Sequence, residues 1–237
     1  MKGFVASLIG LKLWLLLIFA TLFFSSGPLE VKNFAMAEPT PTPAASELNK
    51  RKTSEPYTGD LSIFEDPARD KNLQIDRVMD ILKITEGRTV ADIGAGSGWF
   101  TVRAAKRVGP NGKVFAVEIN QEYIDYIAKR AKEAGFNNIK TILGKPDDPG
   151  LPADSVDAVF ILKTYHEIAE PVALMKKIKT ALKKGGRIGI IDRNGNGADH
   201  GLDKEVVIRE LKLAGLLLKE QFDFVKPDGM DYFLVFE

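Results

Sequence analysis

A glycine-rich stretch, residues 90–100, carries the clearest chemical signal in this sequence. An apolar run leads to Asp92, three alternating glycines follow at 94, 96 and 98, and an amphipathic pattern then begins. Glycine is needed where the chain turns sharply and where a ligand must approach the backbone, because a Cβ atom would block both. A strand, a tight turn and a helix start present backbone N–H groups and the positive end of a helix dipole, which suits a nucleotide-like ligand.

A second acid stands at the distance along the chain that such a site requires. Residues 113–118 form an apolar run that ends in Glu118, 22 residues after Gly96. An acid about 20 residues beyond the turn, at the end of the next parallel strand, can accept hydrogen bonds from both hydroxyls of a ribose. The pair predicts a nucleoside site between the glycine turn and Glu118.

The spacing of the glycines distinguishes two classes of nucleotide-binding protein. A dinucleotide-binding turn reads Gly-x-Gly-x-x-Gly or Ala, whereas this chain has its third glycine at Gly98 and a tryptophan at Trp99. The acid-led Gly-x-Gly-x-Gly pattern resembles the first motif of the class I S-adenosylmethionine (SAM) dependent methyltransferases, and the resemblance extends over roughly residues 70–237. It implies SAM as the cofactor and methyl transfer by in-line displacement. A SAM- or nucleotide-binding protein without catalysis and a dinucleotide-dependent oxidoreductase are the alternatives.

The resemblance also implies a set of cofactor-binding positions at the ends of four predicted strands. These positions are Asp92, Gly94, Ala95, Gly96, Ser97, Gly98, Glu118, Ile119, Gly144, Asp147 and Lys163. Many family members carry an acid directly after the glycine equivalent to Gly144, near the adenine amine, but this chain has Lys145. Asp147 or Asp148 is therefore a candidate to accept from the adenine, with the backbone as the alternative.

Two polar segments are expected to face the transferred group. One follows the strand predicted at 154–162, and the other, at 193–201, follows the strand predicted at 188–192. Open parallel sheets bind their ligands beyond the carboxyl ends of the strands. The candidate catalytic residues in these segments are His166, Tyr165, Glu167 and His200.

Each candidate catalytic residue is chosen for the chemistry of its side chain. His166 and His200 are candidate bases, because an imidazole titrates near neutrality. Glu167 would orient His166 or a cationic substrate, and Tyr165 would line the acceptor pocket. The alternative is that a loop histidine only caps a helix or bonds to the backbone.

No metal site is predicted. The chain has no cysteine, which excludes disulfides, thiolate ligands, a cysteine nucleophile and a lipoprotein anchor. Methyltransferases that act on arsenite resemble this fold but rely on cysteines, so arsenite is not expected as the methyl acceptor. The two histidines and the acids show no metal-ligand spacing along the chain.

The order of apolar segments predicts the fold class. Strands alternate with helices from residue 61 to 237, which favours a single α/β domain with a Rossmann-like, doubly wound sheet of mostly parallel strands. The last two strands are joined by a tight turn at 226–229, so they must form an antiparallel C-terminal hairpin. A continuous helix is expected at 71–83 and a turn at 183–187.

The first 37 residues have a different character. Lys2 and Lys12 precede an apolar run at 13–24, which is shorter than the roughly 20 residues that span a bilayer and is typical of a secretory signal. The Ala-x-Ala sequence at 35–37 would be the cleavage site, but it lies well past the apolar run, so an uncleaved membrane anchor through residues 13–24 is the alternative. Prolines at alternate positions in the segment 38–60 predict an extended linker.

These features predict an exported protein, either periplasmic or membrane-anchored. The net charge of +1 gives no reason to expect a nucleic-acid partner. The methyl acceptor stays open among a small molecule, a lipid and a protein.

Overall fold

The computed structural model describes residues 51, 53, 57, 59–197, 200–226 and 228–237. These described residues belong to one compact unit. The predicted signal or anchor at 1–37, with the possible tether at 13–24, lies outside the described residues. Among the residues that are described, no helix combines the length and the apolar character needed to cross a bilayer.

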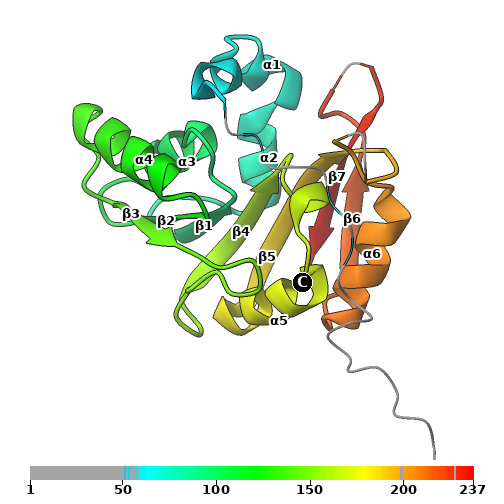
Figure 1. Cartoon of the computed structure of the whole chain (residues 1–237). Coiled ribbons are helices and arrows are strands. Elements are labelled where there is room, and N and C mark those ends of the chain that lie inside the picture. Colours follow the sequence, from blue (N-terminus) through cyan, green and yellow to red (C-terminus); the bar gives the residue numbers. More distant parts are fainter. Residues whose placement is uncertain (1–50, 52, 54–56, 58, 198–199, 227) are drawn as a thin grey trace, which may run out of the picture. The chain divides into compact units, whose positions relative to one another are not determined.

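A seven-stranded sheet in the order β3-β2-β1-β4-β5-β7-β6 forms the centre of this unit (Figure 1). β1 to β5 are parallel, whereas β7 runs antiparallel to both β5 and β6. The predicted Rossmann-like fold with a C-terminal antiparallel hairpin is therefore confirmed. The strands are β1 (Thr89–Ile93), β2 (Lys113–Glu118), β3 (Ile139–Leu143), β4 (Val156–Leu162), β5 (Leu182–Arg193), β6 (Leu218–Phe222) and β7 (Asp231–Phe236).

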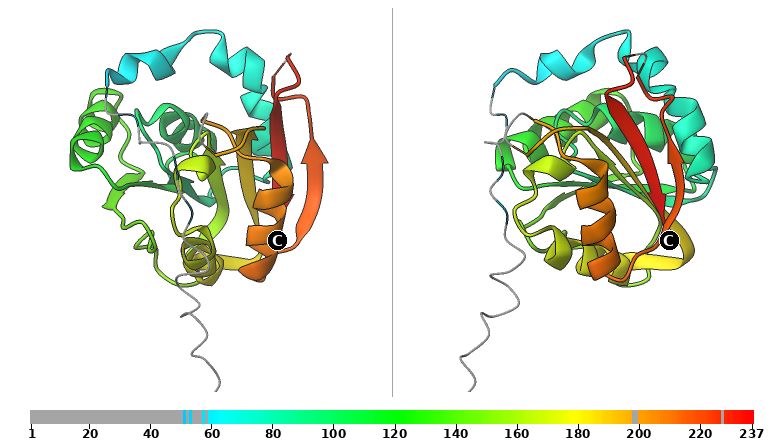
Figure 2. Two further views of the ribbon diagram at one scale, coloured as in Figure 1. Left: turned by 45° about the vertical axis from the view of Figure 1, so that its right-hand side comes forward. Right: turned by 90° about the vertical axis from the view of Figure 1, so that its right-hand side faces the viewer.

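Helices cover both faces of the sheet (Figure 2). α2 and α3 pack on one face and α5 and α6 on the other, while α4 contacts β2 and β3. The helices are α1 (Arg69–Leu73), α2 (Ile75–Ile81), α3 (Trp99–Val108), α4 (Gln121–Glu133), α5 (Pro171–Ala181) and α6 (Lys204–Leu213), with short 3₁₀ turns η2 (Leu61–Glu65) and η3 (Tyr165–Glu167).

The central strands are buried on both faces, which explains their continuous apolar sequences. In β4, Phe160 packs toward α2 and α3 whereas its neighbour Ile161 packs toward α5 and α6. Ile190 and Ile191 alternate in the same way in β5, and all four side chains are fully buried. This core fixes the carboxyl ends of β1, β2, β4 and β5 at one edge of the sheet.

Two local predictions were wrong. The helix expected at 71–83 is broken at Gln74, which has a left-handed backbone (φ 47°) between α1 and α2. The turn expected at 183–187 is part of β5. The register of β5 against β4 shifts there, so that Leu182 pairs with Val156 and Arg187 with Ala158, and the extra residues form a bulge.

The linker predicted at 38–60 is not a free spacer over its described residues. The backbone N–H of Arg51 donates to the carbonyl of Ala169 (3.0 Å), and its guanidinium pairs with Glu210 of α6 (2.7 Å). The hydroxyl of Tyr123 donates to the carbonyl of Tyr57 (2.6 Å). Sequence periodicity gave no sign of these contacts, because they depend on partners far along the chain.

Candidate active site

A cavity of about 1000 Å³ lies at the carboxyl ends of the parallel strands. It opens where β1 stands between β2 and β4, the point at which the strand order reverses. Ligands of open α/β sheets bind at such a switch point. The glycine turn lines the cavity, and so do His166, Glu167 and His200.

The glycine turn has the backbone that its sequence predicts. Gly94, Gly96 and Gly98 all have positive φ (69°, 54° and 74°), and α3 begins directly after them. A Cβ on Gly94 would stand 2.2 Å from the side chain of Thr164, so the turn packs closely against the end of β4. A Cβ on Gly96 would meet no atom within 4 Å and would occupy open space. Gly96 is therefore the point where a ligand can reach the backbone.

Glu118 lies across the cavity entrance from this turn, at the end of β2. One of its carboxylate oxygens accepts from the backbone N–H of Gly96 (3.1 Å) and the other from that of Ile119 (2.7 Å). The two predicted anchor points of the nucleoside site thus meet in space. A carboxylate held in this way by backbone donors is positioned to accept hydroxyl donors from a ribose.

Asp92 is buried beneath the turn. Its carboxyl group accepts a hydrogen bond from the hydroxyl of Thr101 (2.6 Å). The pKa of Asp92 is raised to about 7, because burial disfavours the charged form and the hydrogen bond from Thr101, which lowers the pKa, offsets only part of this effect. Asp92 therefore titrates near neutral pH.

The remaining predicted cofactor positions divide into two groups. Ala95, Ser97, Ile119 and Lys163 line the cavity. Gly98, Gly144 and Asp147 do not line the cavity. In the turn after β3, Lys145 and Pro146 line it. An adenine contact at Gly144 or Asp147 therefore stays a prediction. Lys163 has a left-handed backbone (φ 55°), and its ammonium pairs with buried Asp231 (2.5 Å).

His166 is buried, and its ring is fixed from one side. Its Nδ1 lies 2.9 and 3.1 Å from the two carboxylate oxygens of Asp192, at the end of β5. Asp192 also accepts the backbone N–H groups of His166 (3.0 Å) and Arg193 (2.9 Å). A carboxylate can only accept, so Nδ1 carries the proton and Nε2 is left with its lone pair when the ring is neutral.

Asp192, rather than Glu167, orients His166. Glu167 was expected to orient His166 or a cationic substrate, but its carboxylate stands 3.7 Å from Nε2, too far for a hydrogen bond to the ring. Asp192 was missed as a site residue although it ends a predicted strand in an acid, the same signal that marked Asp92 and Glu118. Burial raises the pKa of Glu167.

The two histidines, 34 positions apart in the sequence, come together in space. Their rings are nearly perpendicular with centroids 5.9 Å apart. Potential ligand atoms of His166, Glu167 and His200 lie within 4.8 Å of one another. The prediction of no metal site rested on spacing along the chain, and such spacing does not show that two loops meet at one edge of the sheet.

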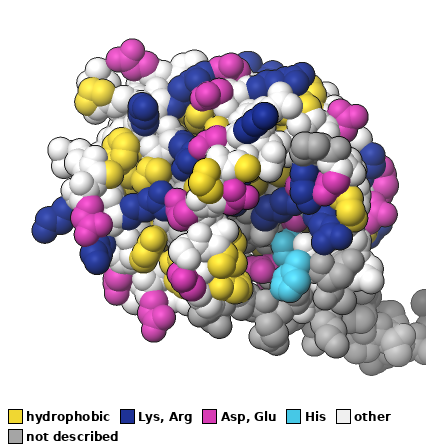
Figure 3. Space-filling model, turned by 90° about the horizontal axis from the view of Figure 1, so that it is seen from above, with side chains coloured by type: hydrophobic (Ala, Val, Ile, Leu, Met, Phe, Trp, Pro, Cys, Tyr) yellow, Lys and Arg dark blue, Asp and Glu magenta, His cyan; other side chains and the backbone are white. Residues whose placement is uncertain are grey.

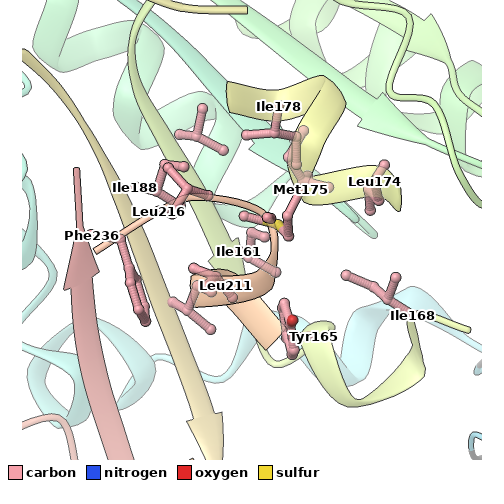
Figure 4. Packing of buried hydrophobic residues seen from close by; sticks show 14 of the residues in the cluster. Ile161, Tyr165, Ile168, Leu174, Met175, Ile178, Ile188, Leu211, Leu216 and Phe236 are labelled. Carbon is pink, nitrogen blue, oxygen red and sulfur yellow. The ribbon is translucent and has the colours of Figure 1, made fainter. Parts of the chain in front are cut away.

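Tyr165 does not line the cavity, which corrects its predicted place in the acceptor pocket. Its side chain is fully buried in the apolar cluster beneath α5 and α6 (Figure 4). Its hydroxyl donates to Glu210 (2.9 Å), and burial raises its pKa well above the usual value. Thr53 and Tyr57, which nothing in the sequence marked, line the cavity instead.

The sequence resembles those of known methyltransferases. Residues 84–223 match the methyltransferase domain family. The chain is 35% identical over 94 residues to protein-L-isoaspartate O-methyltransferase of Methanococcoides burtonii, with 39% of the chain and 46% of that protein covered. It is 31% identical over 114 residues to nocamycin O-methyltransferase of Saccharothrix syringae, with 48% and 41% covered. The chain thus spans about half the length of the curated relatives it matches.

A solved structure shows the same fold. A SAM-dependent methyltransferase from Aquifex aeolicus superimposes with a TM-score of 0.67 at 24% identity, over 76% of this chain and 98% of that one. The glycine turn, the ribose-facing carboxylate and the strand order agree with the family match over more than half of the sequence. The chain therefore belongs to the methyltransferase domain family and has the fold of a SAM-dependent methyltransferase.

Proposed function

We propose that this chain is a SAM-dependent methyltransferase that acts on an oxygen atom of a small organic acceptor, which enters the cavity beside His166, Glu167 and His200. The observation that carries the proposal is the buried His166–Asp192 pair, because His166 lines the same cavity as the glycine turn. Two of the relatives are O-methyltransferases, which supports an oxygen acceptor.

The residues around the glycine turn fit the cofactor. The open space at Gly96 admits a ligand to the backbone, and the carboxylate of Glu118 is positioned for the ribose hydroxyls. Asp92 supplies negative charge beneath the turn when it is ionised. When bound here, SAM supplies an electrophilic methyl group on a sulfonium. The chain's own task is to hold the acceptor in line with that group and to exclude water.

The rest of the cavity suits a small acceptor. Its volume of about 1000 Å³ is at the upper end of the range for small-molecule sites. Apolar side chains, including Ile63, Phe64, Ile168 and Leu174, form much of its wall. An acceptor with an apolar body and a hydroxyl is the class that this wall would bind. A lipid with a hydroxylated headgroup has the same chemistry and is the second substrate to test.

The experiment combines binding and turnover. Transfer of labelled methyl from SAM to a panel of hydroxylated aromatic and aliphatic compounds should identify an acceptor. His166→Ala should lower kcat strongly and leave SAM affinity, measured by calorimetry, nearly unchanged. Equal kcat in the variant, or label transferred only to amines, would contradict the proposal.

A second variant tests the cofactor end. Glu118→Gln should weaken SAM binding by about 1 to 3 kcal/mol, because a hydrogen bond to a charged acceptor is weakened. Glu122→Gln, in the exposed first turn of α4, is the matched control and should bind as the unaltered chain does. If both variants bind SAM equally well, Glu118 has no part in the site.

We also propose that residues 1–37 direct export and leave the catalytic unit outside the cytoplasm. The short apolar run after two lysines supports this proposal. A reporter fused to the C-terminus, active on one side of the membrane only, should report an outer location. Cytoplasmic reporter activity would overturn the proposal and leave the methyltransferase assignment intact.

A further inference from the structure

The cavity end described above contains a buried nitrogen that no protein group satisfies. His166 Nε2 is buried and has no hydrogen-bond partner within the part of the chain that the structure describes. The side chain of His166 is 3% exposed. A buried polar atom without a partner costs free energy, so its retention calls for a ligand.

Two further ligand-type side chains converge on this nitrogen. Glu167 places a carboxylate oxygen 3.7 Å from Nε2, and the ligand atoms of all three residues lie within 4.8 Å of one another. Atoms bound at about 2.1 Å to a common ion stand roughly 3 to 3.5 Å apart at tetrahedral or octahedral angles. A small contraction would bring the group to that spacing. His200 is exposed and lies in a loop, so it can supply the movement.

The surroundings match those of a metal-binding histidine. Such a residue usually donates its other ring N–H to a carboxylate, which fixes the tautomer and aims the lone pair at the ion. Asp192 does this for His166, and it is itself held by two backbone N–H groups. The face in Figure 3 shows histidine side chains at the surface beside an acidic side chain, so an ion could enter from solvent.

We infer that His166, Glu167 and His200 bind one divalent transition-metal ion at the acceptor end of the cavity. Two imidazoles and one carboxylate suit Zn²⁺, Fe²⁺, Mn²⁺ or Co²⁺ rather than Mg²⁺ or Ca²⁺, which prefer oxygen ligands. Three protein ligands leave coordination positions open toward the cavity.

This inference deepens the proposed function and rests on it for the role of the ion. A metal-bound hydroxyl has a lowered pKa and loses its proton to solvent more readily. The acceptor oxygen would then be activated by the ion. Nε2 cannot hold a metal ion and accept a proton at once, so the metal replaces a direct base role for His166.

The metal itself is the first probe. The full chain, prepared without a histidine tag and stripped with a chelator, should bind one equivalent of Co²⁺ with the visible absorption of a nitrogen- and oxygen-ligated ion. Calorimetry with Zn²⁺ should give the same stoichiometry. His200→Ala and Glu167→Gln should lose most of the affinity. Asp192→Asn, which alters a positioning residue, should weaken Zn²⁺ binding by about 10- to 100-fold.

Controls separate this inference from a folding defect and from the function itself. Glu170→Gln changes an acid three residues beyond Glu167 that does not line the cavity, and it should bind metal normally. His200→Ala should keep its circular dichroism and its SAM affinity. Less than one equivalent of metal in the unaltered chain, or equal affinity in all variants, would overturn the inference. Methyl transfer that persists after chelation would overturn the role of the ion and leave the proposed function standing.

Discussion

Asp92 is the residue whose ionisation the fold alters most clearly among those at the site. Burial beneath the glycine turn favours its neutral form, and the hydrogen bond from Thr101 offsets only part of that effect. A charged Asp92 is useful to a cationic ligand but costs stability. The residue therefore links cofactor binding to the stability of the unit.

The pH dependence of unfolding should show this cost. The folded pKa of about 7 exceeds the ordinary value of 3.8, so the folded state binds more protons between them and stability falls as pH rises through that window. Asn cannot titrate and can still accept from Thr101. From pH 5 to pH 8, the unaltered chain should lose roughly 2 to 3 kcal/mol more unfolding free energy than Asp92→Asn. Urea unfolding at both pH values measures the difference, and equal losses would contradict it.

His166 shows how one buried residue can have several chemical roles. Its ring is fixed by Asp192, and its second nitrogen faces a carboxylate and another imidazole. The same geometry could serve a base or a metal ligand. Stoichiometric metal binding decides between these roles more directly than loss of activity, which both predict.

At the scale of elements, the turn between β1 and α3 is the proposed cofactor site. All three of its glycines have positive φ. A Cβ atom on Gly94 would clash with Thr164, whereas a Cβ atom on Gly96 would project into open space. A substitution at Gly96 should therefore separate backbone strain from loss of a ligand.

Gly96→Ala and Gly135→Ala form a matched pair. Both glycines have positive φ (54° and 73°), and a Cβ on either meets no atom within 4 Å. Each substitution should cost about 1 to 2 kcal/mol of stability, because an alanine is held in the left-handed region. Only Gly96→Ala should also weaken SAM binding, by about tenfold or more, since its methyl group enters the cavity. Thermal unfolding and calorimetry provide the two measurements, and a parallel loss of affinity in Gly135→Ala would show that strain alone is responsible.

The catalytic unit extends beyond the boundary that composition indicates. Arg51 bonds to Ala169, Glu210 and the carbonyl of Tyr165, and Thr53 and Tyr57 contribute to the cavity wall. Arg51, Thr53 and Tyr57 are therefore part of the folded unit, and Thr53 and Tyr57 also line the cavity. A chain that begins at residue 61 would lose part of its cavity wall.

Arg51→Ala tests this attachment. The side chains of Arg51 and Glu210 are 16% and 14% exposed, so removal of the guanidinium leaves a mostly buried carboxylate with Tyr165 as its remaining hydrogen-bond donor. We expect the unfolding free energy to fall by about 1 to 3 kcal/mol. Arg88→Ala, which removes a 52% exposed partner of Asp157, is the control and should cost less than about 1 kcal/mol. Equal costs in urea unfolding would show that the Arg51 contact is only a surface contact.

Local patterns in the sequence determined the fold class, the glycine turn and the place of Glu118. Strand and helix periodicity, glycine backbone freedom and the length of a βαβ unit act over neighbouring residues, so they can be read without tertiary structure. The break at Gln74 and the bulge in β5 could not be predicted from these local patterns, because they depend on packing and strand register.

Only the tertiary structure decided which side chains meet at the acceptor end. His166 and Asp192 are 26 residues apart and Arg51 and Glu210 are 159 apart. Their contacts depend on sheet order and on loop paths that no short-range preference specifies. The same reason separated Tyr165, which turned into the core, from its neighbour His166, which faces the cavity. The sequence by itself predicted that a cofactor would bind at the glycine turn and Glu118. The packing of the sheet and its loops decided which side chains line the rest of the cavity.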